Sequence, residues 1–475
     1  MAKDIILCVD LDRTLIATDS ILEALLLAVK RKPIILLLLP FWFLNGKNYV
    51  KHKMTAIAIP DAEFLPYNEE VIEFIKYEKA KGRKIALISA SVQKICNSVA
   101  NHLMLFDEVF GTGLDYDLKG EKKRDFLLAK YGEYKFDYIA DSSSDIPVWL
   151  YANQSYIVNP RKPIVKKLKN KVQFVTIETS RKNRFYNIFK EIRIYQWLKN
   201  LLIFFPLLLA HEITDSDKWI SAVIAFLSFS LCASFVYLTN DLLDLESDRH
   251  HPRKCNRPIA AGNLSVGSAI VFSPIFLLLS FLLSFLFLPL NFTITLFIYL
   301  ILTIFYSFLF KRIYLIDIIL LASLYTIRLV GGAYAVTVNI SYWLLAFSMF
   351  IFLSLAIVKR YTELIVMIED NKTYSKGRGY SISDMSLLSN IGITSGFISV
   401  LVFILYVNSE EIRRLYHNPE FLWPVAICIL IWIVRMWFIA HRGLMHDDPI
   451  VFMSKDKISY VIVFVILLLI IGASI

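Results

Sequence analysis

The chain has 475 residues, of which 56% are hydrophobic and 14% aromatic, and it carries a formal net charge of +10. It is too apolar for an ordinary soluble protein, and basic loops on the cytosolic side of a membrane explain the positive charge more simply than nucleic-acid binding does. The five cysteines are scattered without metal-binding spacing and suit a reducing compartment better than a disulfide framework (Cys8, Cys96, Cys232, Cys255 and Cys428).

Residues 1–158 are predicted to form a soluble α/β domain, because strand-like segments alternate with helical patterns. The first residues lead directly into the strand-like segment IILCV, so we expect no cleavable signal peptide. Three predicted strands end in polar residues, which are Asp10 with Asp12, then Ser89, then Asp141 with Asp145. We therefore expect a functional site at the carboxyl ends of the strands.

Asp10 and Asp12 stand two residues apart where a strand opens into a loop, which suits a nucleophile and a general acid/base. With Ser89, Lys123 and the segment from Asp141 to Asp145, in this order, they resemble the haloacid dehalogenase-like phosphohydrolase superfamily over residues 4–155. The resemblance implies a phosphorylated Asp10, acid/base catalysis by Asp12, and phosphate binding by Ser89 and Lys123. It also implies Mg²⁺, with ligands assigned to Asp10, Asp12, Asp141 and Asp145. Lys122 is an alternative to Lys123, and the alternative for each residue is a strand-end turn or a solvated surface group.

About 75 residues separate Thr14 from Ser89, which is enough for a small helical cap. Residues 21–46 are very apolar but are interrupted by Lys30, Arg31, Lys32 and Pro33, so neither half comfortably spans a bilayer. We expect a pair of cap helices that rests on the membrane, with an ordinary buried cap core as the equal alternative.

Residues 159–188 are predicted to be a basic linker near anionic headgroups, and residues 189–475 an all-α membrane domain. Apolar runs of about 20 residues, the length of a membrane-spanning helix, recur along this domain. They predict nine spans, at about 198–212, 219–239, 266–287, 291–310, 314–336, 341–358, 386–407, 421–440 and 458–474.

The charges of the loops predict the orientation of these spans. If residue 190 is cytosolic, the loops on that side contain fifteen Lys and Arg residues (249–257, 311–312, 359–378 and 435–457). The loops on the other side contain three (211–218, 288–290, 337–340 and 408–420). This bias predicts a multi-pass inner-membrane protein whose N-terminal domain and charged motifs are on the cytosolic side.

Asn240, Asp241, Asp244 and Asp248 form the run N-D-x-x-D-x-x-x-D at the end of an apolar stretch. On a continuous helix these side chains would fall within an arc of about 100°. Unneutralised carboxylates are costly in a bilayer, so the cluster indicates function, and Mg²⁺ is the natural counter-ion. The basic loop that follows, residues 249–258, includes Lys254 and Arg257 and is able to bind a phosphorylated partner. The alternative is a solvated helix end.

This motif, followed by Arg257 and Pro258, resembles the UbiA superfamily of intramembrane transferases. The resemblance implies nine helices and two cytosolic aspartate motifs that clamp a pyrophosphate through Mg²⁺. In the region of the second motif, residues 306–317, only Asp317 is acidic, and Leu320 and Leu321 stand where a second acid would be. This departure disfavours the ordinary prenyl-pyrophosphate reaction.

Four further segments look like the polyprenyl-phosphate phosphoribosyltransferase branch: residues 193–200, 325–328, 359–364 and 448–449. Arg193, Gln196 and Asn200 would share one face of an α-helix, and Trp197 suits an interfacial anchor. A cation deep in a predicted span, Arg328, favours function. His250 and His251 are interpreted as loop residues, and Tyr306 suits a packed aromatic as well as a substrate contact. The candidate substrate-binding residues are Arg193, Gln196, Lys199, Asn200, Asn240, Lys254, Arg257, Tyr306, Lys311, Arg328, Lys359 and Arg360.

The hypothesis that follows is a membrane transferase that moves 5-phosphoribosyl from phosphoribosyl pyrophosphate onto polyprenyl phosphate. Asp241 and Asp244 would be catalytic, and Asp241, Asp244, Asp248 and Asp317 would hold Mg²⁺. The phosphatase-like domain would remove the 5-phosphate from the lipid-linked product. One alternative is a prenyltransferase that acts on an aromatic acceptor. An alternative of another class is a polytopic transporter, which should show repeat symmetry and broken helices in both halves.

Overall fold

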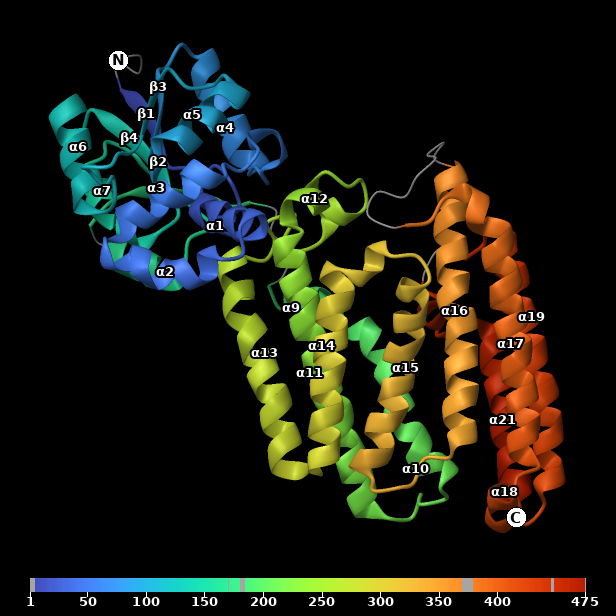
Figure 1. Cartoon of the computed structure of the whole chain (residues 1–475). Coiled ribbons are helices and arrows are strands. Elements are labelled where there is room, and N and C mark those ends of the chain that lie inside the picture. The colour runs from blue at the N-terminus through green and yellow to red at the C-terminus, as the bar shows by residue number, and fades with distance from the viewer. Residues whose placement is uncertain (1–4, 170, 180–183, 370–378, 446–447, 475) are drawn as a thin grey trace. The chain divides into compact units, whose positions relative to one another are not determined.

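The computed structural model describes the whole chain except residues 1–4, 170, 180–183, 370–378, 446–447 and 475 (Figure 1). It divides into two compact units. The first contains Met1–Ile192 and Tyr237–Ser273, and the second contains Arg193–Val236 and Pro274–Ile475. Helices α11 (Ser216–Leu243) and α13 (Val266–Phe287) contribute residues to both.

The first unit is built on a parallel sheet with the strand order β3-β2-β1-β4-β5-β6. The strands are β1 (Ile6–Val9), β2 (Ile85–Val92), β3 (Glu108–Thr112), β4 (Phe136–Ala140), β5 (Ser155–Val158) and β6 (Phe174–Ile177). The central strand β1 is a continuous apolar run, and all four of its residues are buried, as expected of a parallel sheet covered on both faces. The predicted α/β fold of this domain is confirmed.

Two hydrophobic cores cover the two faces of this sheet, because alternate strand residues point to opposite sides. Leu7 and Val9 face helices α4 (Glu69–Ala80) and α5 (Gln93–Leu103). Ile6 and Cys8 face helices α6 (Glu121–Tyr131), α7 (Ile146–Trp149) and α8 (Lys162–Leu168). The same packing brings the carboxyl ends of β1, β2 and β4 to one edge of the sheet, where the candidate residues lie.

The segment predicted as a linker, residues 159–188, contains regular structure. Helix α8 and strand β6 lie within it, and helix α9 (Arg184–Glu191) begins there. Because β6 pairs with β5, the sheet extends to Ile177, beyond the predicted domain boundary at residue 158. Arg181 and Lys182 of the predicted linker lie outside the described residues.

The expected helical cap is present, as helices α1 (Ser20–Arg31), α2 (Ile35–Leu44) and α3 (Lys47–Ile57). The pair of helices predicted within residues 21–46 is formed by α1 and α2, which differ in burial. Helix α1 buries Glu23, Ala24, Leu27 and Ala28, whereas α2 buries only Ile35 among its ten residues. The apolar run therefore divides into an internal helix and an exposed one.

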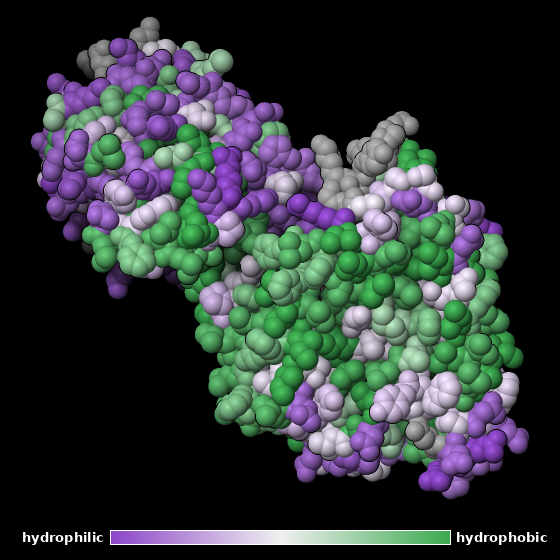
Figure 2. All heavy atoms as spheres, in the orientation of Figure 1, coloured by the Kyte–Doolittle hydropathy of each residue, from purple (hydrophilic) through white to green (hydrophobic). Residues whose placement is uncertain are grey.

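The second unit is helical. Its longer helices beyond α11 and α13 are α14 (Leu290–Phe308), α15 (Ile316–Ala335), α16 (Tyr342–Glu369), α17 (Met385–Val407), α19 (Trp423–His441) and α21 (Lys457–Ser474). Its short elements are η4 (Ile194–Phe204), α10 (Phe205–Leu209), η6 (Phe310–Arg312), η7 (Ile382–Asp384), α18 (Glu410–Leu415), η8 (Pro419–Leu422) and α20 (Pro449–Met453). The visible face of these helices is largely hydrophobic (Figure 2), as expected of surfaces that contact lipid.

Eight helices among the described residues are long and apolar enough to cross a membrane, where nine spans were predicted. The difference lies in the first predicted span, 198–212. Residues Ile194–Leu209 form a shorter apolar stretch there, mostly a 3₁₀-helix. Gly332 of α15 allows this stretch to pack closely, because a Cβ at that position would lie 2.2 Å from the carbonyl oxygen of Ile203.

Candidate functional site

A buried ion cluster lies at the carboxyl end of β1. Lys123 on α6 donates through Nζ to Oδ1 of Asp10 at 2.9 Å and to Oδ1 of Asp145 at 3.2 Å. It also donates to the hydroxyl of Tyr138 at 2.8 Å. All four side chains are buried. The structure therefore brings together three of the predicted residues, from a strand end, a helix and a 3₁₀-turn.

Asp12 has a separate set of partners. Its carboxylate accepts from the backbone N–H of Ser20 at 2.8 Å and from the hydroxyl of Ser91 at 2.6 Å. The predicted phosphate ligand Ser89 is buried, and its hydroxyl accepts from the backbone N–H of Ser91 at 3.1 Å. Ser91 and Ser20 were not among the predicted residues. The pattern Ser89-Ala90-Ser91 after a strand was the available signal for the first of them.

Burial changes the acid–base properties of this cluster. It raises the pKa of Asp10 to about 8, with nearby Asp145 and Asp12 adding to the increase and Lys123 opposing it. Burial, together with the negative charge of Asp19, raises the pKa of Asp12 to about 6, and the hydrogen bonds from Ser91 and Ser20 oppose this rise. An acid whose pKa lies near neutrality can both donate and accept a proton at physiological pH.

The carboxylates in this cluster are hard oxygen donors of the kind that Mg²⁺ prefers, and Asp141, which directly follows β4, is also buried. In the part of the chain that the structure describes, however, no three His, Cys, Asp or Glu side chains are gathered closely enough to hold a metal ion. Lys123 lies between Asp10 and Asp145. The carboxylate oxygens are therefore of a type that suits Mg²⁺. In this structure Lys123 supplies the positive charge that neutralises Asp10 and Asp145, and a bound metal would add to that positive charge.

The aspartate motif does not lie on one continuous helix as predicted. Helix α11 ends at Leu243, Asp244 adopts a non-helical conformation, and a short helix α12 (Leu245–Arg249) carries Asp248. The turn is closed by Arg257, which donates to Oδ1 of Asp241 at 2.7 Å and also to Asp248. Asp241 and Asp248 are therefore brought together by tertiary contact with the basic loop and not by helical periodicity.

The three aspartates of this motif differ in their surroundings. Asp241 and Asp248 are buried, whereas Asp244 is 40% exposed and lies 3.3 Å from Nζ of Lys30 in the cap helix α1. Burial raises the pKa of Asp248, and the positive charge of Arg257 opposes that rise. Lys254 lies 3.9 Å from Asp248. Arg257 and Lys254, which were predicted to bind phosphate, thus neutralise the predicted metal ligands Asp241 and Asp248.

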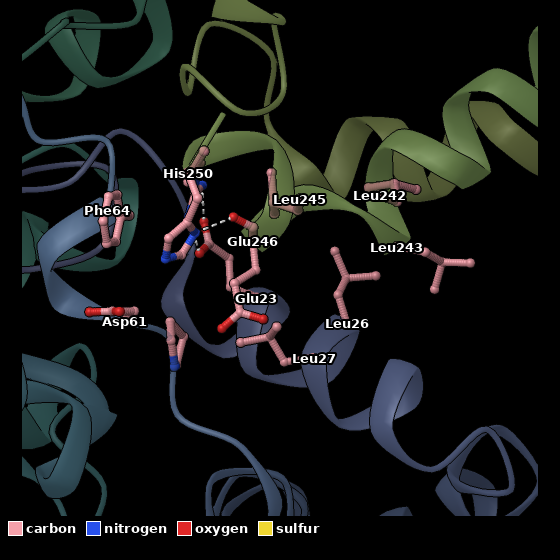
Figure 3. Close-up of a pocket in the computed structure, with 12 residues that line it drawn as sticks. Glu23, Leu26, Leu27, Asp61, Phe64, Leu242, Leu243, Leu245, Glu246 and His250 are labelled. Atoms are coloured by element: carbon pink, nitrogen blue, oxygen red, sulfur yellow. Dashed lines mark hydrogen bonds and ion pairs between the residues drawn. The ribbon is translucent and has the colours of Figure 1, made fainter. Parts of the chain in front are cut away.

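A buried ion pair that was not predicted joins this loop to the cap. Arg249 donates through both terminal nitrogens to the two carboxylate oxygens of Glu23 at 2.6 Å each. Its Nε donates to the carbonyl oxygen of Ala260 at 3.0 Å. A partly open pocket of about 380 Å³ surrounds the pair (Figure 3), lined by Leu26, Leu27, Phe64, Leu242, Leu245 and His250 among others. The ring centroids of His250 and Phe64 lie 3.8 Å apart with the ring planes tilted by 32°, so this histidine packs against Phe64.

In the second unit, Asp317 is completely buried and paired. Arg360 donates to Oδ1 of Asp317 at 2.9 Å and to the hydroxyl of Tyr306 at 2.8 Å, and Tyr306 also donates to Asp317 at 2.9 Å. The same guanidinium donates to Glu363 at 2.7 Å. The structure brings together the predicted residues Tyr306, Asp317 and Arg360, and it adds Glu363. The predicted metal ligand here is bonded to arginine.

A second buried carboxylate in this unit gathers two predicted cations. Lys199 and Lys359 donate to Oδ2 of Asp448 at 2.8 and 3.0 Å. These charges hold the pKa of Asp448 well below its usual range, against the effect of burial. A pocket of about 230 Å³ adjoins Lys359 and Asp448 and is otherwise lined by Tyr325 and apolar residues.

Arg328 is buried within its helix, and Asn200 holds its guanidinium. Nε of Arg328 donates to Oδ1 of Asn200 at 2.7 Å, and a terminal nitrogen donates to the hydroxyl of Tyr299 at 3.1 Å.

Because residues 194–204 form a 3₁₀-helix with three residues per turn, Arg193, Gln196 and Asn200 do not share the α-helical face that was predicted. Lys199 and Asn200 are instead the buried polar residues of this stretch. Trp197 bonds to Ser234 at 3.1 Å, and Lys311 lies at the half-exposed turn η6.

Comparison with known proteins places both parts of the chain in families. Residues 201–455 match the UbiA prenyltransferase family, and residues 7–149 match the haloacid dehalogenase-like hydrolases. A protein of Sinorhizobium fredii called "Uncharacterized protein y4nM" is 34% identical over 456 residues, covering 95% of this chain and 88% of that protein.

Two further similarities concern the membrane part. The decaprenyl-phosphate phosphoribosyltransferase of Corynebacterium glutamicum is 37% identical over 188 residues, covering 39% of this chain and 57% of that enzyme. The solved structure of a UbiA homolog from Archaeoglobus fulgidus, bound to DMAPP and Mg²⁺, covers 60% of this chain and 99% of its own, with 17% identity and a TM-score of 0.46.

Proposed function

This chain belongs to the UbiA prenyltransferase family and carries an N-terminal haloacid dehalogenase-like hydrolase domain, and from that premise we propose that it makes and then dephosphorylates a lipid-linked sugar phosphate. The membrane domain would transfer 5-phosphoribosyl from phosphoribosyl pyrophosphate to the phosphate of a polyprenyl lipid. The hydrolase domain would then remove the 5-phosphate.

The choice of donor rests on one observation, which is that Asp317 is buried and paired with arginine. In the family pattern a second acidic motif shares the metal-bound pyrophosphate, but here the remaining acid is buried and bonded by Arg360. An acid that arginine already neutralises is a poor metal ligand, which disfavours a pyrophosphate held through metal at two acidic motifs. The similarity to decaprenyl-phosphate phosphoribosyltransferase over 188 residues supports the same donor.

The proposed roles in transfer follow from charge and position. Asp241, Asp244 and Asp248 would hold Mg²⁺, which when bound supplies charge neutralisation of the leaving pyrophosphate. Asn240, Lys254 and Arg257 would bind donor phosphates. Lys199, Lys311, Arg328 and Lys359 would bind phosphate groups, with Arg193, Gln196, Asn200, Tyr306 and Arg360 as further substrate-binding candidates.

In the hydrolase domain, Asp10 would attack the phosphorus of a phosphomonoester while Asp12 donates a proton to the departing oxygen. Water would then hydrolyse the aspartyl-phosphate, with Asp12 accepting the proton. Lys123 is placed to neutralise charge beside Asp10, and Ser89 would bind a phosphate oxygen. The product would be inorganic phosphate and a dephosphorylated lipid-linked sugar.

We also propose that both sites are on the cytosolic side of the membrane. With eleven residues in η4 and five in α10, the stretch Ile194–Leu209 would be about 30 Å long, because a 3₁₀-helix rises about 2.0 Å per residue. That length matches the hydrocarbon core, and a ninth crossing by this stretch agrees with the distribution of basic loops. Labelling of Cys255 by a membrane-impermeant thiol reagent only after the cells are opened would support this orientation.

Product analysis tests the proposed transfer. Purified protein would receive radiolabelled phosphoribosyl pyrophosphate with or without polyprenyl phosphate, and in parallel a labelled prenyl pyrophosphate with aromatic acids. Label should enter the organic phase only in the presence of polyprenyl phosphate. Label on an aromatic acid would instead establish the alternative prenyltransferase. No product under any condition would favour the transporter.

A matched pair of variants tests the aspartate motif. Asp241→Asn should abolish transfer, because losing one charge at the pyrophosphate site removes several kcal/mol of stabilisation. Asp217→Asn is the control, since Asp217 is exposed in the first turn of the same helix. Transfer by the Asp241 variant at the wild-type rate, with Mg²⁺ limiting, would refute the assignment.

A further inference from the structure

Helix α2 presents an apolar surface that the domain itself does not cover. All ten residues of the helix are apolar, and among them only Ile35 is buried. Leu37 is 73% exposed and Leu44 is 85% exposed, and the adjacent exposed side chains are Ile34, Leu36, Leu38, Phe41 and Phe43. On the visible face of the first unit, which is mostly hydrophilic, a hydrophobic patch lies where Figure 1 draws α2 (Figure 2). An apolar patch of this kind marks an interaction surface.

The hydrophobic cluster on the inner side of α2 includes the end of a candidate membrane-spanning helix. The inner side of α2 packs through Ile35, Leu39 and Trp42 against Ala28 and Val29 of α1 and Ile57 of α3. Leu243, the last residue of the candidate span α11, belongs to the same cluster. The inner side of α2 and the last residue of this candidate span therefore share one hydrophobic cluster.

The charges around α2 identify the kind of surface that it fits. Residues 24–60 contain six Lys and Arg residues and no Asp or Glu (Lys30, Arg31, Lys32, Lys47, Lys51 and Lys53). Lys30, Arg31 and Lys32 directly precede the helix and are exposed, and Lys47 follows it and is exposed. An apolar helix bordered by cations on both sides is suited to the interface of a bilayer that contains anionic lipids.

Two of the cap helices, α1 and α3, also donate hydrogen bonds at the candidate hydrolase site. The first residue of α1, Ser20, donates its backbone N–H to Asp12 at 2.8 Å, and Lys51 on α3 donates to the carbonyl oxygen of Ala90 at 2.8 Å. Helix α1 has twelve residues and is therefore about 18 Å long. Its other end leads into α2 through Lys32 and Pro33. One helix length thus separates the candidate catalytic acid from the apolar surface.

We propose that α2 lies in the headgroup region of the membrane with its apolar side in the acyl chains, and that it holds the hydrolase site at the membrane surface. The site would then accept phosphomonoesters carried by lipids in preference to soluble ones. The position of α2 stands independently of the proposed function, whereas the choice of substrate rests on the proposed phosphatase activity.

The position of α2 is tested with the full chain in nanodiscs of phosphatidylglycerol and phosphatidylcholine. Cys255 and Cys428 would be replaced by serine, and Leu37→Cys would carry an environment-sensitive fluorophore. Leu114→Cys is the matched control, since Leu114 is 69% exposed on the same domain, outside the cap. Spin labels in the acyl chains should quench the fluorophore at residue 37 and leave the one at residue 114 at background. Equal and weak quenching at both positions would overturn the proposal. Quenching that requires two chains per disc would assign the surface to a second copy.

The choice of substrate is tested with the double variant Leu37→Glu and Phe41→Glu. Hydrolysis of a polyprenyl-linked phosphomonoester in vesicles should fall by about tenfold or more, because two apolar anchors no longer enter the bilayer. Hydrolysis of p-nitrophenyl phosphate should be unchanged, which also shows that the domain is folded. Undiminished hydrolysis of the lipid substrate would refute the membrane-surface role. Absence of both activities in the wild-type chain would refute the phosphatase assignment, and the quenching result would still decide the position of α2.

Discussion

The two aspartates at the end of β1 show what individual residues contribute beyond their positions in a motif. Asp10 and Asp12 are two residues apart, yet Asp10 bonds to Lys123 and Asp12 bonds to Ser20 and Ser91. The motif predicted two carboxylates at a strand end. Their partners differ, and two of them, Lys123 and Ser91, come from elements that are distant in the sequence.

Replacement of Asp19 should shift the pH dependence of hydrolysis. The negative charge of Asp19 raises the pKa of Asp12, so Asp19→Asn should lower that pKa from about 6. The protonated acid is lost as the pH rises through its pKa, so the alkaline decline of kcat should move to lower pH. Asparagine preserves the cap of helix α1, where Asp19 accepts from the backbone N–H of Leu22.

The measurement is the pH profile of p-nitrophenyl phosphate hydrolysis at constant Mg²⁺. Asp61→Asn serves as the control, because Asp61 also accepts a backbone N–H at the start of a helical turn but is not among the groups that affect the pKa of Asp12. A decline at the same pH in the wild-type protein and the Asp19 variant would show that Asp12 is not the acid.

The buried pair of Glu23 and Arg249 should be important for stability. Glu23→Gln would leave Arg249 buried without its counter-ion, which typically costs about 3–5 kcal/mol. The pair of Lys30 and Asp244 provides the control, because both side chains are about 40% exposed and such pairs contribute about 0–1 kcal/mol. Thermal unfolding in detergent should therefore show a much lower transition temperature for Glu23→Gln than for Lys30→Gln. Similar transitions for both variants would contradict this account.

At the scale of elements, apolar length and periodicity predicted most helices but not their geometry. Eight of the predicted spans correspond to long apolar helices among the described residues. The first predicted span, 198–212, is mostly a 3₁₀-helix in the structure. The aspartate motif lies on two helices that are joined at Asp244. In both places close tertiary contacts determine the local conformation, through Gly332 in one and Arg257 in the other.

The close contact at Gly332 is directly testable. Gly332→Ala would place a methyl group 2.2 Å from the carbonyl oxygen of Ile203 and 2.9 Å from its neighbouring backbone atoms, so η4 or α15 must move. The variant should be clearly less thermostable in detergent. Gly472→Ala is the control, since its Cβ would meet only the Phe421 ring at 3.5 Å or beyond, and it should be neutral or slightly stabilising. Equal stability of the two variants would show that the close packing of η4 is not required.

At the scale of the whole molecule, the two proposed activities should be separable. Asp10→Asn should stop phosphomonoester hydrolysis, because an amide cannot act as the nucleophile, and it should leave lipid transfer intact. Asp241→Asn should have the opposite effect. A phosphorylated lipid-linked sugar should accumulate with the Asp10 variant and be detectable by mass spectrometry. Loss of transfer in a folded Asp10 variant would show that the domains depend on each other for catalysis.

The sequence by itself determined the α/β domain, the series of membrane helices and the acidic residues at the ends of strands and spans. Each of these depends on local information, because hydropathy, periodicity and strand-end polarity are read within about twenty residues. For residues 21–46 the sequence left a membrane-resting helix pair and a buried cap core as equal alternatives, and it did not separate the buried helix α1 from the exposed helix α2.

Only the tertiary structure decided which charged groups become partners. Glu23 pairs with Arg249, Asp317 with Arg360, and Asp448 with Lys199, and each pair joins elements that are far apart in the chain. A buried charge must be neutralised, but several oppositely charged residues could have met that need. The packing of the helices selects among them, because it places particular side chains within hydrogen-bonding distance when the apolar surfaces come together.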